Sequence, residues 1–363
     1  MRRENFLEKK LQERREQDAF RSLRLPAGKT DLCSNDYLGI IHYGLLETSE
    51  AHWLKHGSGG SRLLAGNDVL TESTEQLLAA FHQAETGLLY NSGYDANLGL
   101  LSSVPQRGDT VIYDQLSHAS IRDGIRLSFA QSFSFRHNDL EDLERRLQAA
   151  TGTVFVVTES VFSMDGDQAP LVEMLVLCER YHARLIVDEA HATGVIGERG
   201  EGLVQQLQLQ DRIFARVVTF GKAVGCHGAI VLGSKLLRDY LINFSRSFIY
   251  TTALPQSAIR AIRDAYALFP GMKKERALLG SLINLFQSAK LPFDKLVSHT
   301  PIQVVIIPGN EQVKAVATRL QDAGMDVRPI LYPTVPKGGE RLRIVLHAFN
   351  TEAEVAKLIE LLQ

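Results

Sequence analysis

The sequence lacks the features that mark secreted and nucleic-acid-binding proteins. Its 363 residues include only three cysteines, Cys33, Cys178 and Cys226, whose spacing matches no metal-binding motif. Their odd number argues against a disulfide framework, so we expect a reducing, cytoplasmic compartment and no bound metal. The formal net charge is only -2, which provides no electrostatic basis for binding nucleic acid or an anionic membrane.

Long apolar runs are absent as well. No segment approaches the ~18 apolar residues that a membrane-spanning helix requires. The N-terminus is charged from Arg2 onward and has no apolar core of the kind found in signal peptides. The hydrophobic fraction of 45% and charged fraction of 23% are those of an ordinary globular protein. The length suggests one large domain and a smaller one. Because long apolar runs are missing, we expect no membrane partner.

The first segment, residues 1–45, is predicted to contain a charged helix and a short strand. Apolar positions recur with helical spacing over residues 4–24, among many charges. Such a helix buries little apolar surface by itself, so we expect it to pack against a partner surface, such as another subunit. A short strand and turn follow at residues 32–39.

A large domain is predicted over residues 46–255, because apolar runs and helical segments alternate regularly there from about residue 87. The predicted strands of this region lie at residues 88–90, 110–113, 132–135, 154–158 and 185–187. Repeated β-α units of this length indicate an α/β fold with a mostly parallel sheet and helices on both faces. Ligands of such sheets bind at the carboxyl ends of the strands.

The pattern changes after Pro255. Two long helices are predicted at residues 256–269 and 273–288, and strands and helices then alternate to the end of the chain. We therefore expect a smaller α+β domain over residues 256–363.

Lys222 lies where a buried strand ends in a turn flanked by glycines. Val217 and Val218 belong to the apolar run, and Gly221 and Gly225 bracket the turn. This arrangement predicts an amine held at the rim of the sheet, where a desolvated lysine can form a Schiff base with a carbonyl compound. An ordinary surface lysine is the alternative, since lysines are common in turns.

Asp188 closes another buried strand. A carboxylate in that position is costly without a partner, and a protonated pyridine nitrogen is one partner that it would keep charged. His191 follows three residues later and can reach the same ligand. An N-cap aspartate and an ordinary loop histidine are the alternatives.

Two further strand ends carry groups suited to a flat, phosphorylated ligand. Gly93 and Tyr94 begin a predicted helix, whose N–H groups and dipole favour an anion. His118 starts the next helix, where its imidazole can lie over a heteroaromatic ring or serve a purely structural role. Thr219 ends the strand before Lys222.

Ser163 and Arg343 are weaker candidates. The Ser163 hydroxyl follows a buried strand and can bind a ligand oxygen, although turn capping explains it equally well. Arg343 lies in a predicted strand, on the same face as Arg341. It can bind a carboxylate through two guanidinium N–H groups, or it can simply face solvent. Taken together, the amine, the carboxylate, the phosphate site and the imidazole suit pyridoxal phosphate.

The motifs resemble those of the α-oxoamine synthases, a pyridoxal-phosphate family with the fold of aspartate aminotransferase. The resemblance covers nearly the whole chain. The matching runs are Ser34-Asn35-Asp36-Tyr37-Leu38-Gly39, Gly57-Ser58-Gly59-Gly60-Ser61-Arg62, Leu116-Ser117-His118-Ala119-Ser120, Phe162-Ser163-Met164-Asp165-Gly166-Asp167, Asp188-Glu189-Ala190-His191-Ala192-Thr193-Gly194 and Thr219-Phe220-Gly221-Lys222. It implies PLP fold type I, with a large sheet domain and a small C-terminal domain.

The resemblance also implies roles for individual residues. Lys222 would bind the coenzyme and act as the base, and Asp188 would pair with the ring nitrogen. His118 would stack on the ring, and His191 and Ser163 would bind its phenolic oxygen. The implied phosphate ligands are Gly93, Tyr94 and Thr219, with Thr251 or Thr252 from a second subunit of a homodimer. The implied substrate ligands are Asn35 and Arg343 for a carboxylate and Arg21 for the acyl group.

Within the family, the chain is most similar to members that serve biotin biosynthesis. Those members condense L-alanine with pimeloyl-CoA or a pimeloyl-carrier protein and release CO2 and the thiol. Cys226 and His227 depart from the usual pattern after the lysine, which leaves the acyl-chain specificity open. The alternatives within the family are glycine C-acetyltransferase, 5-aminolevulinate synthase and enzymes like serine palmitoyltransferase. A non-catalytic subunit and a plain aminotransferase are the alternatives outside it.

Overall fold

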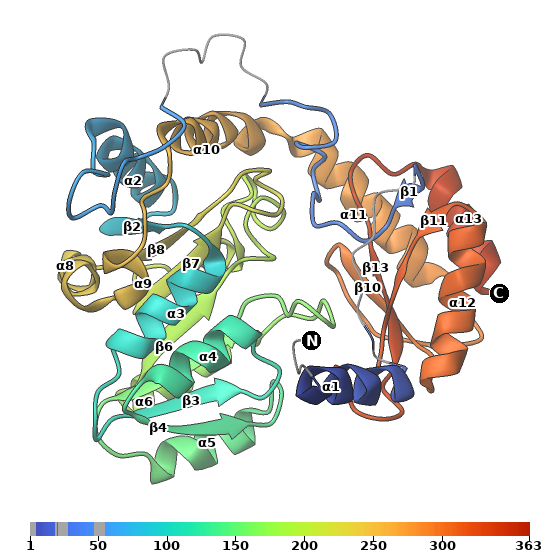
Figure 1. Cartoon of the computed structure of the whole chain (residues 1–363), viewed down its shortest axis with the longest axis horizontal. Coiled ribbons are helices and arrows are strands. Elements are labelled where there is room, and N and C mark those ends of the chain that lie inside the picture. Colours follow the sequence, from blue (N-terminus) through green and yellow to red (C-terminus); the bar gives the residue numbers. More distant parts are fainter. Residues whose placement is uncertain (1–4, 19, 21–27, 47–54) are drawn as a thin grey trace. The chain divides into compact units, whose positions relative to one another are not determined.

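The computed structural model describes residues 5–18, 20, 28–46 and 55–363 (Figure 1). Within these ranges, no helix is long and apolar enough to cross a membrane. The described residues form two compact units. The larger consists of residues 35–163 and 168–276, and the smaller of the described residues up to 34 with residues 164–167 and 277–363. The two compact units do not coincide with the segments predicted from the sequence, whose boundaries lie after residues 45 and 255. The predicted domain boundaries remain predictions, because a compact unit need not be a domain that folds independently.

The larger unit contains most of the regular structure. Its elements in chain order are α2 (Val69–Phe81), β2 (Thr86–Tyr90), α3 (Gly93–Ser103), β3 (Thr110–Asp114), α4 (Ala119–Leu127), β4 (Gln131–Phe135), α5 (Leu140–Ala149), β5 (Val154–Glu159), α6 (Leu171–Arg180), β6 (Arg184–Asp188), α7 (Leu203–Gln206), β7 (Ala215–Thr219), β8 (Ala229–Gly233), α8 (Lys235–Phe244), α9 (Arg246–Ile249), α10 (Gln256–Leu268) and the 3-10 helix η1 (Phe269–Gly271). The helix α11 (Lys273–Ser288) begins in this unit and continues in the smaller one.

The central sheet of the larger unit has seven strands in the order β2-β8-β7-β6-β5-β3-β4. The pairs from β7 through β4 are parallel, and β8 runs antiparallel to both of its neighbours. The mostly parallel sheet expected from the alternating sequence pattern is therefore confirmed. Because parallel strands place their carboxyl ends at one edge, Glu159, Asp188 and Thr219, the last residues of β5, β6 and β7, lie along the same edge.

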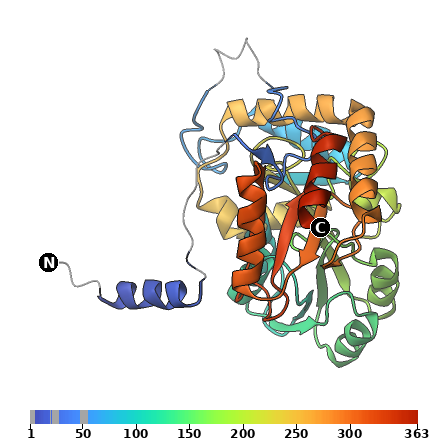
Figure 2. The same ribbon diagram turned by 90° about the vertical axis from the view of Figure 1, so that its right-hand side faces the viewer.

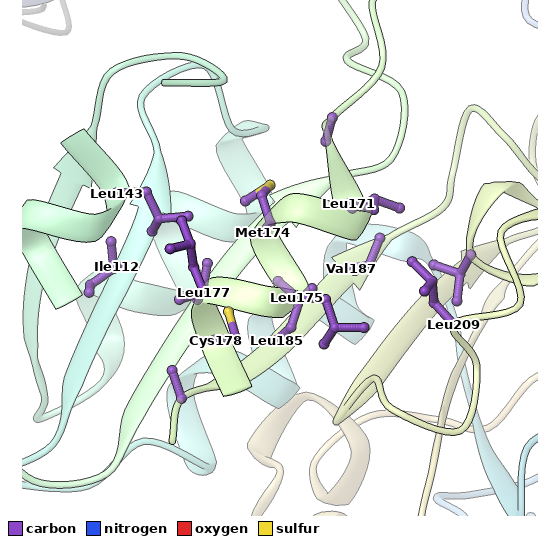
Figure 3. Packing of buried hydrophobic residues seen from close by; sticks show 14 of the residues in the cluster. Ile112, Leu143, Leu171, Met174, Leu175, Leu177, Cys178, Leu185, Val187 and Leu209 are labelled. Carbon is purple, nitrogen blue, oxygen red and sulfur yellow. The ribbon is translucent and has the colours of Figure 1, made fainter. Parts of the chain in front are cut away.

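Successive residues of the central strands belong to two separate hydrophobic clusters, one on each face of the sheet. Val111 and Ile186 pack with α3, α4 and α8, whereas Ile112 and Val187 pack with α5 and α6. Figure 3 shows the second cluster, in which Met174, Leu177 and Cys178 of α6 lie close to Leu143 and Leu185. Burial on both faces explains why these strands appear in the sequence as unbroken apolar runs.

The smaller unit has its own antiparallel sheet. Its elements are α1 (Asn5–Glu16), β1 (Thr30–Asp31), β9 (Asp294–Lys295), β10 (Ile302–Ile306), α12 (Asn310–Asp322), β11 (Met325–Asp326), β12 (Arg328–Ile330), β13 (Arg341–Val345) and α13 (Glu352–Leu362). The sheet order is β12-β13-β10-β9, and β1 pairs separately with β11. Figures 1 and 2 together show α12 and α13 side by side on one face of that sheet.

The N-terminal helix is shorter than the sequence predicted. It ends at Glu16, because the chain turns at Asp18, whose φ of 57° is left-handed. Residues 19 and 21–24 of the expected helix lie outside the described residues.

Candidate active site

The candidate active site is a cavity of about 260 Å³ that lies within the larger unit, at the carboxyl edge of its sheet. Seven residues singled out in the sequence line it: Gly93, Tyr94, His118, Asp188, His191, Thr219 and Lys222. They come from four separate segments of the chain, and the strand ends bring them together. No single sequence motif predicts that these residues lie close together; only the folded structure shows it.

The predicted anion site lies at the start of α3 and the end of β7. Ser92 caps α3, and its hydroxyl oxygen accepts a hydrogen bond from the Asp95 backbone N–H over 3.1 Å. A Cβ added to Gly93 would lie 2.4 Å from Cγ2 of Thr219, so only glycine allows this close approach. The buried Thr219 hydroxyl has no hydrogen-bond partner within the described part of the chain. A phosphate oxygen at the helix N-terminus would supply one.

Asp188 is held as a hydrogen-bonded carboxylate. Its Oδ1 accepts from the Ala190 backbone N–H over 2.8 Å, and its Oδ2 accepts from the Asn97 side chain over 2.7 Å. The residue is only 6% exposed, and these two hydrogen bonds fix the orientation of its carboxyl group. The same Asn97 amide donates to the Ser120 hydroxyl over 3.0 Å, which ties α3 to α4 beside the cavity.

His118 is fixed at the N-cap of α4. Its backbone N–H donates to Oε1 of Glu159 over 2.7 Å, and its Nδ1 lies 2.8 Å from the Ser120 hydroxyl oxygen. Burial lowers the pKa of His118, and the positive charge of Lys222 adds to this, although Asp188 opposes it. The imidazole is therefore held in one orientation, and its lowered pKa favours the neutral form.

Glu159 is a cavity residue that the sequence analysis missed. It is 3% exposed, and burial together with the nearby Asp188 carboxylate raises its pKa to about 8. In register, Glu159 lies beside Asp188 on the neighbouring strand. The signal that identified Asp188, a carboxylate at the end of an apolar strand, also applies to Glu159. Asn97, Ser120 and His227 also line the cavity. The sequence analysis noted His227 only as a departure from the family pattern, and no local sequence feature distinguishes Asn97.

Lys222 occupies the turn after β7, and its carbonyl accepts from the Gly225 backbone N–H over 2.9 Å. The turn is packed tightly, because a Cβ on Gly225 would lie 2.7 Å from Cγ2 of Ile40. His191 is 4% exposed and lies in the turn after β6, within the same cavity.

The remaining predicted site residues lie elsewhere. Ser163 is not among the lining residues, although its backbone N–H bonds Glu159. Thr251 and Thr252 lie near Asn91, which donates to the Thr251 hydroxyl over 3.0 Å and to the Thr252 carbonyl over 2.9 Å. Thr251 lines a second, smaller cavity.

The predicted substrate ligands are spread over both units. Asn35 belongs to the larger unit, and its Oδ1 accepts from the Tyr37 hydroxyl over 3.2 Å. Arg343 lies in β13 of the smaller unit, and its neighbour Arg341 is paired with Asp165. Arg21 lies outside the described residues. The predicted roles of all these residues stay predictions.

A comparison with known protein families shows which family the chain belongs to, and therefore which coenzyme the cavity binds. A model described as aminotransferase class I and II matches residues 27–362. The chain belongs to this family. Its cofactor is pyridoxal 5'-phosphate, whose phosphate suits the Gly93–Thr219 cradle and whose ring suits the groups around Asp188 and His118.

Individual relatives place the chain among the α-oxoamine synthases. It is 43% identical to 8-amino-7-oxononanoate synthase of Emericella nidulans, covering 93% of this chain and 89% of the relative. It is 38% identical to the enzyme of the same name from Marinobacter nauticus, covering 98% and 94%. PLP fold type I and the α-oxoamine synthase assignment are thus confirmed.

Solved structures agree with this assignment. Serine palmitoyltransferase from S. paucimobilis, with a bound PLP-myriocin aldimine, matches with a TM-score of 0.87 and 27% identity, covering 99% of this chain and 96% of that one. The 8-amino-7-oxononanoate synthase of Francisella tularensis matches with a TM-score of 0.77 and 29% identity, covering 92% and 96%.

Proposed function

We propose that this chain catalyses the reaction of 8-amino-7-oxononanoate synthases, the decarboxylative condensation of L-alanine with a pimeloyl thioester in biotin biosynthesis. The observation that carries the proposal is the set of relatives of that name, at 38–43% identity over nearly the full chain. The cavity supports it, because one space within a single unit holds the lysine, the carboxylate and the histidines that such chemistry needs.

Bound pyridoxal phosphate supplies an electron sink at the Cα of the amino acid. Lys222 holds the coenzyme and then takes the α-proton of alanine at its Nζ. Asp188 would pair with the ring nitrogen, and the hydrogen bond from Asn97 keeps Asp188 oriented for that role. His118, which Glu159 and Ser120 hold in place, would lie against the ring.

The other ligands complete the proposed site. Gly93, Tyr94 and Thr219 hold the phosphate at the start of α3. His191 and Ser163 bind the ring oxygen. Asn35 and Arg343 bind the carboxylate of the amino acid, and Arg21 binds the acyl substrate.

A homodimer is part of the proposal. Thr251 or Thr252 of one subunit would reach the phosphate bound by the other, so each site would need both chains. The three cysteines, none of which forms a disulfide, support a cytoplasmic location.

A second candidate is a reaction like that of serine palmitoyltransferase, because structures of that enzyme superimpose with TM-scores up to 0.87. Their sequence identity of 27–29% is well below that of the biotin-pathway relatives. We therefore rank this reaction second.

Product identification separates the two candidates. The purified protein is incubated with L-alanine, glycine or L-serine against pimeloyl-, acetyl-, succinyl- and palmitoyl-CoA, and products are identified by mass together with released CO2. We expect 8-amino-7-oxononanoate from alanine with pimeloyl-CoA, and no turnover by Lys222→Ala. Lys235→Ala, at the start of α8, is the control that keeps activity. A product formed only from serine and palmitoyl-CoA would refute the proposal.

A further inference from the structure

His227 is a cavity residue to which the proposed function gives no role. It departs from the usual family pattern after the lysine, yet it lines the same cavity as Lys222 and is exposed there. An exposed histidine in a turn needs no special role. Its place within the cavity therefore decides what it can bind.

The loop between β7 and β8 holds His227 in place. The Phe220 N–H donates to the Gly228 carbonyl over 2.9 Å, and the Cys226 N–H donates to the Phe220 carbonyl over 2.7 Å. A Cβ on Gly228 would lie 3.1 Å from the Tyr90 carbonyl oxygen, at the end of β2. Both chain neighbours of His227 are thus fixed by backbone contacts, so the position of its backbone is well defined.

This loop emerges on the side of the predicted anion site. In the central sheet, β8 lies between β2 and β7 (Figure 1). The first residue of β8, Ala229, pairs with Tyr90 and Thr219, the last residues of those two strands. Because β8 runs antiparallel to both, His227 lies just beyond the ends of β2 and β7. The chain after β2 leads directly to Gly93, so His227 lies beside the two segments that form the anion site.

The proposed phosphate ligands include no positively charged side chain. The start of α3 offers backbone N–H groups, and Thr219 offers a buried hydroxyl that has no hydrogen-bond partner among the described residues. The Asp95 carboxylate in the first turn of α3, which accepts from the Ser92 hydroxyl over 2.8 Å, adds a negative charge nearby. A bound phosphate would gain Coulomb attraction if one of its donors were a cation.

Four of the residues that line the cavity have a basic side chain, namely Lys222, His118, His191 and His227. The first is proposed to bind the aldehyde carbon of the coenzyme, and the next two are proposed to bind its ring. His227 is the fourth, and it lies on the phosphate side. An imidazole can donate an N–H to a phosphate oxygen from either its neutral or its charged form.

We propose that His227 is a further ligand of the coenzyme's phosphate, contributed by the same loop that carries Lys222. This inference rests on the proposed phosphate site at Gly93 and Thr219. One loop would then hold the coenzyme at two points, its aldehyde carbon and its phosphate.

The test compares pyridoxal phosphate with pyridoxal, which lacks the phosphate, in titrations of the coenzyme-free protein. His227→Ala removes the imidazole. His182→Asn is the control, because His182 is another exposed histidine of the larger unit and precedes β6, at the opposite edge of the sheet. Asparagine suits its left-handed φ of 54°.

We expect His227→Ala to weaken the affinity for pyridoxal phosphate by roughly tenfold or more and to leave the affinity for pyridoxal unchanged, whereas His182→Asn changes neither. An equal loss for both compounds, or no loss for either, would overturn the proposal. A raised KM for pimeloyl-CoA with unchanged affinity for pyridoxal phosphate would show that His227 contacts the acyl substrate instead, and would overturn it as well.

A second readout uses inorganic phosphate and the unmodified chain. The ¹⁵N signals of the His227 ring, assigned by their absence in His227→Asn, should shift when inorganic phosphate is added to the coenzyme-free protein. No response to inorganic phosphate would overturn the proposal, even if His227→Ala does not fold. Product identification in the unmodified chain is independent of both readouts, so failure of the proposed function is recognised separately.

Discussion

Asn97 donates a hydrogen bond from its side-chain amide to Oδ2 of Asp188 over 2.7 Å, in the buried interior of the larger unit. The other carboxylate oxygen accepts from the Ala190 backbone N–H. A buried carboxyl group is stable only with such partners. The group that we propose to pair with the coenzyme's ring nitrogen is therefore held in place by the fold before the coenzyme binds.

Removing that charge should abolish most of the activity. In Asp188→Asn, a neutral amide cannot keep the ring nitrogen protonated, and we expect kcat to fall by about a hundredfold or more. The measurement is steady-state turnover of alanine with pimeloyl-CoA. Asp211→Asn, which changes an exposed carboxylate of the same unit, is the control and should retain full activity. If Asp188→Asn kept half the activity of the unmodified chain, the assigned role of this residue would be wrong.

A methyl group at Gly93 should weaken coenzyme binding. Its Cβ would lie 2.4 Å from Cγ2 of Thr219, so the start of α3 must move away from β7 and the phosphate ligands would separate. We expect at least roughly tenfold weaker affinity, because one or more hydrogen bonds to a charged group are lost. Affinity is measured by titrating the coenzyme-free protein with pyridoxal phosphate.

The control for this substitution is Gly280→Ala in α11, where an added Cβ would meet nothing within 4 Å. Its coenzyme affinity should equal that of the unmodified chain. Equal affinities of Gly93→Ala and Gly280→Ala would show that the α3 terminus is not the phosphate site.

The buried Glu159 should make stability depend on pH. Its pKa in the folded state is about 8, above the ordinary value of 4.5, because burial and Asp188 disfavour the charged form. Between pH 4.5 and about pH 8, Glu159 is ionised in the unfolded chain but protonated in the folded chain. The contribution of Glu159 to the free energy of unfolding therefore falls as pH rises through this range. Glutamine cannot ionise and avoids this loss.

We therefore expect Glu159→Gln to gain stability relative to the unmodified chain as pH rises from about 5 to 8, by at most on the order of 1 kcal/mol per pH unit. The measurement is denaturant unfolding of both coenzyme-free proteins across this range. The opposite trend, or a constant difference between the two, would mean that Glu159 is ionised in the folded protein.

Asp188, His118, Thr219 and Lys222 attracted attention in the sequence because each follows or ends a buried strand, and the structure places all four around one cavity. Their roles stay predictions. Glu159 obeys the same rule, but its strand was predicted to end one residue earlier, at Thr158. The burial of both faces of the central sheet could also be predicted from the sequence, because unbroken apolar runs are typical of strands that are covered on both sides.

Other features depend on contacts between distant segments and leave no local trace. Asn97 lies inside α3 and becomes significant only because β6 brings Asp188 within 2.7 Å. The contact of Tyr37 with His191 joins residues that are 154 positions apart. The assignment of residues 164–167 to the smaller unit follows from partners far along the chain, including the Ser298 hydroxyl, which donates to the Gly166 carbonyl over 2.8 Å.

The cluster beneath α5 and α6 should dominate the stability of the larger unit. Leu143 is fully buried in it, so Leu143→Ala should lower the free energy of unfolding by about 2–5 kcal/mol through lost burial and a residual cavity. Leu236→Ala, at a position that is 80% exposed, should change it by less than about 0.5 kcal/mol. Denaturant unfolding measures both, and similar small losses in the two variants would contradict the packing in Figure 3.

The covalent role of Lys222 is tested most directly by borohydride reduction of the coenzyme-loaded protein, followed by digestion with trypsin and mass spectrometry. Reduction fixes the coenzyme on the amine that holds it, and trypsin does not cut after a modified lysine. We expect an uncut peptide of residues 217–235 that carries the phosphopyridoxyl group on Lys222. A label on another lysine, or cleavage after an unlabelled Lys222 in fully loaded and reduced protein, would contradict the account.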